Sequence, residues 1–413
     1  MAALAAAGDL DPGYGSGGIA VVGAPSGSQT WAMAVQSGGE TILAGRNGAD
    51  AWRLARLSAA GVPQTGFASS AGSVSGEAIA LDLDDDDIVA GGYVIELVAT
   101  GKGKNATTTE IHRPAVARWF ADGTMDTDFG TDGVATLAIP DGYTVLSVRA
   151  RPDGKVVVAG GATAKGSGRR APTSGAWFVA RLLATGSLDT TFGTGGYVLY
   201  NPTDLDDGPR ANSMVVLADG SVVVGGRVGW DAALHSGGYS TIARFSGSGS
   251  LQAVANRASE FMPHLALDGA GRLVAAGVAQ GQAQQLFVTR YDLSSGAITT
   301  DTTFGTAGTT TINAPSGTSF TNGWAWIAVG PTDRIALTYV PGANGDVEVA
   351  ALTATGTLDG GFGTHGFADP IDTGSTEFNP MAAFDDSDRL LVGGCAFGTS
   401  DSVDWIVARL LAN

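Results

Sequence analysis

The chain has 413 residues, of which 44% are hydrophobic and only 15% charged, and its formal net charge is −17. Binding to nucleic acid or to an anionic membrane surface is disfavoured, because phosphate contacts need a basic face. No apolar run approaches the roughly 18 residues of a spanning helix, so membrane insertion is not expected. The single cysteine, Cys395, excludes an intramolecular disulfide and a cysteine-rich metal site.

The first seven residues, MAALAAA, are small and apolar. They resemble the end of a secretion signal whose preceding regions have been removed. We therefore interpret residues 1–7 as the remnant of an export signal or leader and residues 8–413 as a single domain. A secreted, periplasmic or cell-surface location is the corresponding expectation.

Seven β-hairpins are predicted along the chain. Each combines a strand of alternating apolar and polar residues, a short turn of Asp-Gly or Gly-Gly type, and a second strand that often ends in glycine. An example is VRARPDGKVVVAGG at residues 148–161. The seven hairpin segments are residues 33–45, 79–92, 145–161, 214–226, 265–277, 327–339 and 381–394.

A third strand follows each hairpin, and in six units it carries an arginine near its end. These residues are Arg56, Arg118, Arg181, Arg244, Arg290 and Arg409, whereas the sixth unit has Ala351. A phrase of the form LDxxFGxxG comes next, as at residues 188–196, and precedes a fourth short strand. Four strands per unit, in units of roughly 60 residues, are typical of a β-propeller.

The two ends of the chain complement each other. The last unit stops after its third strand, and residues 8–22 supply the missing phrase and fourth strand. A closed ring also removes the unpaired strand edges of an open stack. We therefore predict an all-β fold: a seven-bladed β-propeller with four antiparallel strands per blade, closed by the N- and C-terminal strands together.

The phrase aspartates have two possible roles. They can accept backbone N–H groups and so hold the turn, or they can bind calcium. A calcium site needs several oxygen ligands, and each phrase offers one reliable carboxylate, so no cofactor is predicted and calcium is the alternative. The recurrent arginines are likewise interpreted as scaffold residues paired with carboxylates, with an anion-binding ring as the alternative. The aspartates are Asp11, Asp126, Asp189, Asp301 and Asp359.

The phrase LDxxFGxxG, together with a hairpin of the form DGKVVVAGG, resembles the delta-60 repeat family of bacterial, mostly exported proteins. The resemblance extends over essentially the whole chain. It implies a propeller-like architecture and a bacterial origin. The family brings no reaction, substrate or catalytic residue to this sequence.

Catalytic motifs are mostly absent: the sequence contains no HExxH, no CxxC and no phosphate-binding GxxxxGK[ST]. The four histidines are scattered over four units. His264, at the start of a strand, is interpreted as a packing residue. The acidic stretch at residues 82–87 is interpreted as a solvated hairpin turn, because it lacks the glycine and distal glutamate of a calcium loop.

The segments between the second and third strands vary most and should emerge on one face of the ring. Three of the four lysines lie in two of them, which suggests a basic lip for an anionic ligand, with histidines and aromatic residues nearby. The alternative is a flexible, solvated pair of loops whose lysines only aid solubility. The candidate ligand-binding residues are Lys102, Lys104, His112, Arg113, Lys165, Arg169, Arg170, Trp230, His235 and Tyr239.

The predicted function is that of an exported bacterial binding or interaction module, whose partner is an acidic polysaccharide or a protein. One alternative is a glycan-active lyase or hydrolase with its site at the mouth of the propeller. Another is a purely structural cell-surface repeat protein. An enzyme requires acids, bases or metal ligands that converge in one pocket, whereas a binding module does not.

Overall fold

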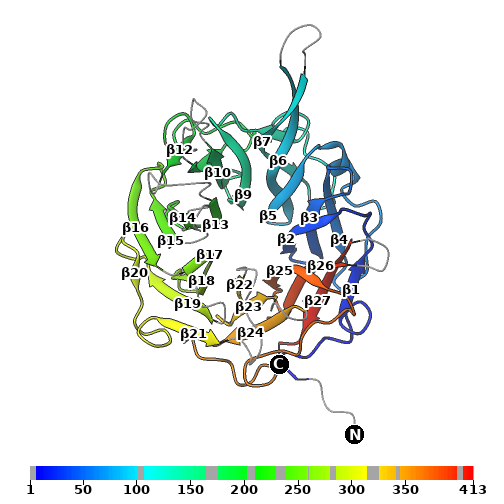
Figure 1. Cartoon of the computed structure of the whole chain (residues 1–413), viewed down its shortest axis with the longest axis vertical. Helices are drawn as coiled ribbons and strands as arrows, with labels where there is room; N and C mark the ends of the chain where they lie inside the picture. Colours follow the sequence, from blue (N-terminus) through cyan, green and yellow to red (C-terminus); the bar gives the residue numbers. More distant parts are fainter. Residues whose placement is uncertain are drawn as a thin grey trace.

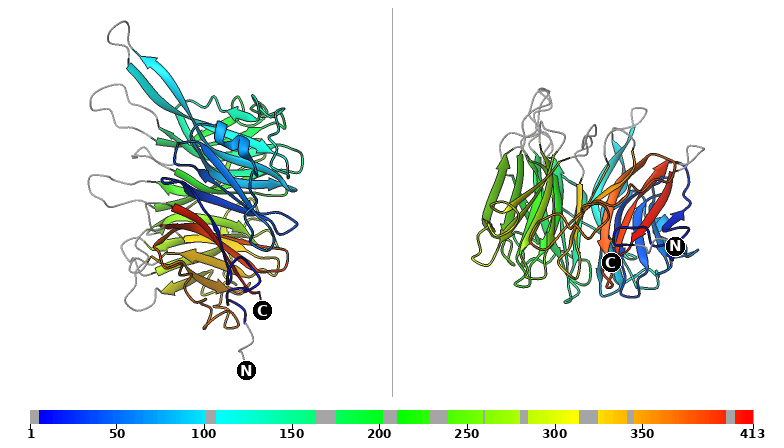
Figure 2. Two further views of the ribbon diagram at one scale, coloured as in Figure 1. Left: turned by 90° about the vertical axis from the view of Figure 1, so that its right-hand side faces the viewer. Right: turned by 90° about the horizontal axis from the view of Figure 1, so that it is seen from below.

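The computed structural model describes residues 6–100, 107–163, 175–201, 210–228, 239–258, 260–279, 285–313, 325–340, 345–397 and 403–412. In this part of the chain, seven antiparallel sheets are arranged radially around one axis (Figure 1). The predicted seven-bladed β-propeller is therefore confirmed. Seen from the side, the sheets form a single ring, and the hairpin of the second blade extends beyond it (Figure 2).

We number the blades by the chain order of their innermost strands. The first four blades contain β2 (Gln29–Val35), β3 (Thr41–Arg46) and β4 (Trp52–Leu57); β5 (Glu77–Asp84), β6 (Asp87–Thr100), β7 (Thr107–Trp119) and β8 (Val134–Thr136); β9 (Gly142–Ala150), β10 (Val156–Thr163), β11 (Gly175–Leu182) and β12 (Tyr197–Tyr200); and β13 (Arg210–Val216), β14 (Val222–Val228), β15 (Tyr239–Phe245) and β16 (Leu251–Ala258).

The remaining three blades follow the same order. They contain β17 (Glu260–Leu267), β18 (Leu273–Ala279), β19 (Gln285–Asp292), β20 (Thr299–Thr300) and β21 (Thr309–Asn313); β22 (Ala325–Val329), β23 (Ile335–Tyr339) and β24 (Glu348–Leu352); and β25 (Glu377–Phe384), β26 (Leu390–Phe397), β27 (Val403–Leu410) and β1 (Ile19–Val22).

The ring closes as predicted. β1 pairs antiparallel with β27 from Ile19↔Ala408 to Val22↔Trp405, so the start of the chain completes the seventh blade. Ala7 is also buried, and its carbonyl accepts the N–H of Gly363 in the neighbouring blade at 2.7 Å. The domain limits at residues 1–7 and 8–413 stay a prediction.

Two blades depart from four continuous strands. In the first blade, the 3-10 helix η1 (Ser69–Ser73) follows Phe67 of a degenerate phrase, and pairing is reduced to isolated bridges such as Ala51↔Ser75. In the sixth blade, the outer position is held by the bridges Ala350↔Phe367 and Val347↔Ile371. Pro370 lies between these two bridges and has no N–H for a continuous ladder.

Aromatic rings of the phrase fill the space between blades. Phe129, Phe192 and Phe304 are fully buried, and Phe129 packs with residues of both the second and third blades, such as Val116 and Val158. Burying such a ring contributes about 2 kcal/mol each. The interfaces between blades are therefore continuous apolar layers.

The recurrent arginines hold the outer part of the ring. In the third blade, Arg181 Nε donates to Asp189 Oδ2 at 2.8 Å, its Nη1 donates to the carbonyl of Gly247 in the next blade, and its guanidinium lies over Phe192. We call the ion pair between the arginine and the phrase aspartate, with the guanidinium lying over the aromatic ring of the phrase, a rim clasp. Four blades contain one: Arg118/Asp126/Phe129, Arg181/Asp189/Phe192, Arg290/Asp301/Phe304 and Arg409/Asp11/Tyr14.

The sixth unit, which has Ala351 at the arginine position, uses a different arginine. Arg334, from the turn between β22 and β23, donates to Asp359 Oδ2 at 3.0 Å and to the carbonyl of Ala412 in the next blade at 2.9 Å. The arginines and the phrase aspartates therefore serve the scaffold.

Candidate functional site

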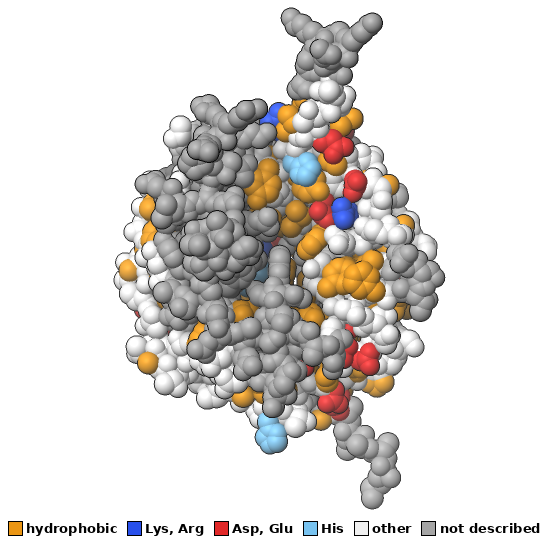
Figure 3. Space-filling view, viewed as in Figure 1, with side chains coloured by type: hydrophobic (Ala, Val, Ile, Leu, Met, Phe, Trp, Pro, Cys, Tyr) orange, Lys and Arg blue, Asp and Glu red, His pale blue; other side chains and the backbone are white. Residues whose placement is uncertain are grey.

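A cavity of about 590 Å³ lies on the axis of the propeller. Its lining comes from the innermost strand of every blade: β2, β5, β9, β13, β17, β22 and β25. On the face shown in Figure 3, hydrophobic, acidic, basic and histidine side chains lie close together above and to the right of the ring centre. The axis is therefore the place where residues from all blades can act on one ligand.

β-Bulges determine which side chains line this cavity. The pairing of the innermost strand with its neighbour shifts register at Trp31 in β2, Ile79 in β5, Leu146 in β9 and Asn212 in β13. All four residues line the cavity. A bulge bends the strand and re-aims a side chain, so the same local irregularity places four different side chains around the axis.

Two charged residues occupy equivalent positions in neighbouring blades. Asp82 of β5 and Arg149 of β9 both line the cavity, opposite Val89 and Val157 of their second strands. The other five blades have small apolar residues at this register position. These are Ala34, Val215, Ala266, Ala328 and Ala383.

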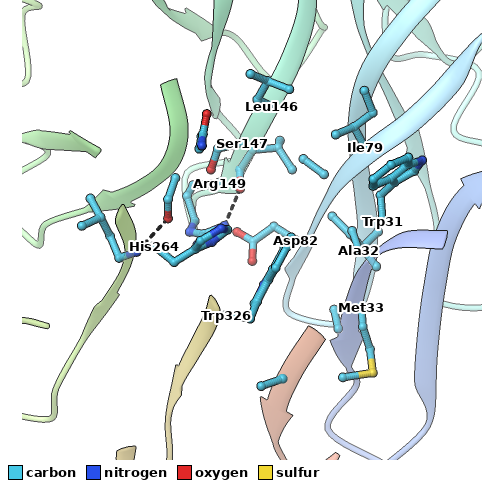
Figure 4. A pocket seen from close by; sticks show the side chains of 18 of the residues that line it. Trp31, Ala32, Met33, Ile79, Asp82, Leu146, Ser147, Arg149, His264 and Trp326 are labelled. Atoms are coloured by element: carbon cyan, nitrogen blue, oxygen red, sulfur yellow. Dashed lines mark hydrogen bonds between the residues drawn. The ribbon is translucent and has the colours of Figure 1, made fainter. Parts of the chain in front are cut away.

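Asp82 and Arg149 are held mainly by backbone groups. Asp82 Oδ2 accepts the N–H of Ala150 at 2.8 Å, and Arg149 Nη1 donates to the carbonyl of Val148 at 2.7 Å. Burial inside the ring raises the pKa of the Asp82 carboxyl, while the nearby Arg149 charge opposes this rise. In Figure 4 both side chains point toward the same part of the cavity as His264.

His264 is a buried polar residue of the cavity wall. Its side chain belongs to a residue only 6% exposed, and its ring centroid lies 4.3 Å from that of Trp326. Among the described residues, Nε2 has no hydrogen-bond partner. Burial lowers the pKa of His264 to about 4, so the ring is neutral at pH 7. His264 therefore packs against Trp326 and also faces the cavity, so the predicted packing role does not describe it fully.

A second polar cluster surrounds Glu77, at the start of β5 and far from the turn that joins β5 to β6. Trp31 Nε1 donates to Glu77 Oε1 at 2.5 Å, the Tyr93 hydroxyl lies 3.4 Å from Oε2, and Arg46 Nε lies 3.4 Å from Oε1. Burial raises the pKa of Glu77, and burial with the neighbouring Glu77 charge raises the pKa of Tyr93 to about 12. These contacts hold the Trp31 indole in place at the cavity.

The ring of Tyr93 connects this cluster to one of the predicted loop residues. His112 of β7 stacks on Tyr93 with a centroid distance of 4.1 Å. The adjacent Arg113 forms an ion pair with Glu96 across the β6–β7 hairpin at 2.7 Å. Within the described hairpin, the positive charge of Arg113 is therefore balanced by a carboxylate.

Most of the predicted lip lies outside the described residues. Tyr239 begins β15, and its side chain is not described. The described members His112 and Arg113 are consecutive residues of β7. Seven of the ten candidates lie outside the described residues: Lys102, Lys104, Lys165, Arg169, Arg170, Trp230 and His235.

The cavity residues were missed by reasoning on motifs and loops. They could be found by aligning the seven innermost strands and looking for charged or aromatic residues where sister units have Ala or Val. The acidic stretch at residues 82–87 illustrates this point. Asp85 and Asp86 lie in the predicted turn, whereas Asp82 belongs to β5 and lines the cavity.

In the described ranges, no group of three or more histidine, cysteine, aspartate or glutamate residues is arranged to hold a metal ion. The described helical segment is too short to cross a membrane, and no other helix in those ranges could do so. The phrase carboxylates accept hydrogen bonds from arginines and turn N–H groups, and calcium binding stays an alternative prediction.

Comparison with known proteins gives one family match. Residues 151–192, from the turn before β10 to Phe192 of the phrase, match a family described as "Domain of unknown function (DUF5122) beta-propeller". A comparison with curated proteins finds no match.

Several solved structures are similar to the chain. A protein of unknown function from Dyadobacter fermentans is 11% identical, with a TM-score of 0.49, over 97% of this chain and 100% of that one. A polysaccharide lyase of family PL25, an ulvan lyase bound to -[GlcA(1-4)Rha3S]-, is 13% identical, with a TM-score of 0.49, over 93% and 95% of the two chains. The polysaccharide lyase Uly1 is 12% identical, with a TM-score of 0.45, over 92% and 90%. The family match and the seven blades together support a propeller repeat family.

Proposed function

We propose that the protein is a ligand-binding propeller whose axial cavity receives a polar, carbohydrate-like molecule. One observation carries this proposal: Asp82 and Arg149 stand where the other five blades have alanine or valine, and both face the same cavity as His264. A scaffold position that is filled by alanine or valine in sister blades needs no charge for folding. The exceptions therefore point to a ligand.

The chemistry of the wall supports a sugar-like ligand. The half-buried indoles of Trp31 and Trp326 line the cavity and offer flat apolar surfaces. Around them, Asp82, Arg149 and Asn212 supply both hydrogen-bond donors and acceptors. A cavity of this size with a few convergent polar groups is typical of small-molecule sites.

The charges of the wall favour a neutral or mixed-charge ligand inside the cavity. Glu77 and Asp82 oppose the single described cation, Arg149, and His264 is neutral at pH 7. A polyanion has no excess of positive charge to bind there among the described residues.

We assign the predicted anionic glycan or protein partner to the outer lip, the loops between the second and third strands that carry the predicted ligand-binding residues. Its described members are His112 and Arg113, and Arg113 is already paired with Glu96. We extend the proposal to this lip as the place where a longer, acidic ligand continues beyond the cavity. Export to the cell surface or periplasm and membership of the delta-60 repeat family are parts of the same proposal.

We favour binding over catalysis because the described hydrogen bonds do not join the three polar residues of the proposed site to one another. General acid–base catalysis needs groups within hydrogen-bond reach of each other or of one reacting atom. In the described part of the cavity, no hydrogen bond joins Asp82, Arg149 or His264 to another of the three. A glycan-active enzyme at the propeller mouth is the alternative proposal.

A glycan array followed by titration calorimetry tests the proposal. For the best-bound oligosaccharide, Trp326→Ala and Arg149→Gln should each raise Kd by at least about tenfold, which corresponds to about 1.4 kcal/mol. Phe120→Ala is the matched control, because Phe120 is 46% exposed and lies outside the cavity. Unchanged binding in both cavity variants would contradict the proposed site, and turnover of the oligosaccharide would favour the enzyme.

A further inference from the structure

In the rim clasps, the arginine Nε always has a carboxylate acceptor. The acceptor is the aspartate of the phrase in the same blade. In the first blade the phrase is degenerate, and Gln64 Oε1 takes this place at 2.5 Å from Arg56 Nε. The four Nε to Oδ2 distances are 2.6 Å for Arg118–Asp126, 2.8 Å for Arg181–Asp189, 2.8 Å for Arg290–Asp301 and 2.9 Å for Arg409–Asp11.

The fourth blade has the arginine without the acceptor. Gln252 occupies the aspartate position of the fourth blade. In the third blade, Leu188 pairs with Leu182 and Asp189 follows it. In the fourth blade, Leu251 pairs with Phe245 and Gln252 follows it. The Gln252 residue is exposed. Arg244 is only 5% exposed, and its Nε has no hydrogen-bond partner in the described part of the chain. A buried donor left without an acceptor costs free energy, so the Nε–H of Arg244, which has no described acceptor, requires an explanation.

The other two nitrogens of Arg244 are held differently. Nη1 donates to the carbonyl of Leu293 in the fifth blade at 2.6 Å, which anchors the guanidinium. Nη2 lies 3.3 Å from Asp219 Oδ2, and the Asp219 side chain is 58% exposed. On the edge of the guanidinium formed by Nε and Nη2, the Nε–H therefore has no acceptor among the described residues, and Nη2 makes one long contact with an exposed carboxylate.

A second cavity, of about 470 Å³, adjoins this arginine between the fourth and fifth blades. Its lining comes from the β13–β14 turn, from Arg244 of β15, from the β17–β18 turn and from the end of β19. Its volume falls within the range of small-molecule sites, about 300–1,000 Å³. Leu217, Leu267 and Leu293 give it apolar walls. Its three acidic wall residues all have partners: Asp268 is paired with Arg272 at 2.7 Å, Asp219 with Arg244 at 3.3 Å, and Asp292 Oδ1 accepts the N–H of Ser294 at 2.8 Å.

We infer that this cavity binds the carboxylate of a small organic acid. The two carboxylate oxygens accept from Nε and Nη2 of Arg244, in the place that the phrase aspartate occupies in sister blades. Asp219 turns out to solvent and releases Nη2 as the ligand enters. Two parallel N–H to oxygen bonds of this kind are stronger and more directional than a single contact. The apolar walls accommodate the body of the acid, so a uronic acid fits better than acetate.

Side-chain NMR of the whole protein tests this inference directly. Titration with sodium glucuronate should shift the Nε–H resonance of Arg244 saturably, with a weaker response to acetate and none to glucose. The Nε–H resonance of Arg181 serves as an internal control, because Asp189 already fills its acceptor position. A linear shift of both resonances would show only a salt effect and would overturn the inference.

Two variants locate the site. Gln252→Asp rebuilds the sister-blade acceptor within the chain and should raise the Kd for glucuronate by at least about tenfold. Asp219→Asn removes the competing carboxylate and should lower that Kd severalfold. Both residues are exposed, and asparagine at position 219 can still accept the Ser221 N–H that Asp219 Oδ1 accepts at 2.8 Å, so neither variant should disturb folding. Binding that is insensitive to Gln252→Asp, or no saturable shift in the wild-type protein, overturns the inference. Neither outcome bears on the axial cavity, which these substitutions leave intact.

Discussion

The rim and the axis of this propeller use the same repeat in opposite ways. At the rim, four blades repeat one arrangement of arginine, aspartate and aromatic ring with nearly constant distances. At the axis, equivalent positions hold Ala34, Asp82, Arg149 or Val215, depending on the blade. Residues that recur from blade to blade serve packing, whereas residues that differ between equivalent positions are available for a site shared by the whole ring.

Removing the closing segment should have the largest effect on the rim. Deletion of residues 1–22 removes β1, the buried Tyr14 and Val22, and the Asp11 partner of Arg409. We expect the free energy of unfolding to fall by more than about 5 kcal/mol, from lost burial and a broken ion pair. Urea unfolding followed by tryptophan fluorescence measures this.

A circular permutant is the control for this deletion. It starts at residue 23 and continues after residue 413, through a short linker, into residues 8–22. Gly8 N–H donates to the carbonyl of Leu411 at 3.0 Å, so the junction is short. The permutant should keep near wild-type stability. An equally destabilised permutant would show that connectivity, and not the closing strand, matters.

Breaking one rim clasp should have the next largest effect. Asp189→Ala leaves the 14% exposed Arg181 side chain without its acceptor and also frees Lys155. The free energy of unfolding should fall by about 3–5 kcal/mol at pH 7. Asp128→Ala, at an exposed position of the same kind of phrase, should change it by less than about 0.5 kcal/mol. Equal effects would remove the distinction between clasp and surface carboxylates.

The clasps also predict acid sensitivity. Burial alone would raise the pKa of Asp189, but hydrogen bonds from Thr191 and Lys155 and the charge of Arg181 hold it well below its ordinary value. A depressed carboxyl pKa contributes stability above the unfolded-state value of about 3.9, and this contribution is lost as pH falls below it. In Asp189→Ala, the loss of stability between pH 5 and pH 2 should therefore be smaller than in the wild-type protein.

At the axis, protonation of His264 should change the free energy of unfolding by a smaller amount and over a different pH range. The folded-state pKa of His264 is about 4, below the unfolded value of about 6.5. The unfolded state therefore binds the proton more readily, and stability should decline by up to about 3 kcal/mol as pH falls from 6.5 to 4. NMR titration of the imidazole should give a midpoint near 4. His264→Gln should lose this part of the pH dependence, and a midpoint near 6.5 would contradict the buried environment.

The smallest effect is expected for an exposed ion pair. Arg113 and Glu96 are 42% and 51% exposed on the β6–β7 hairpin. Arg113→Gln should change the free energy of unfolding by less than about 0.5 kcal/mol, because such pairs are screened by water and salt. If the outer lip binds an acidic glycan, the same variant should weaken that binding at low salt and leave the axial cavity unaffected.

Much of the rim was predictable from the sequence. The hairpin turns, the phrase and the complementary chain ends led to seven blades and to closure by β1 and β27, because turn chemistry and strand alternation are local. The acceptors of Arg244 and Arg56 were not predictable. Gln64 and Gln252 occupy the same register, yet only Gln64 reaches its arginine.

What the sequence determined by itself is the repeated unit, its strands and turns, and the number of blades, since each depends on residues that lie close together in the chain. Only the tertiary structure decided which residues share the axis. Asp82, Arg149, His264 and Trp326 come from four different blades, and β-bulges and ring curvature, not sequence spacing, bring them into one cavity. The order of blades around a closed ring converts residues that are far apart in sequence into neighbours.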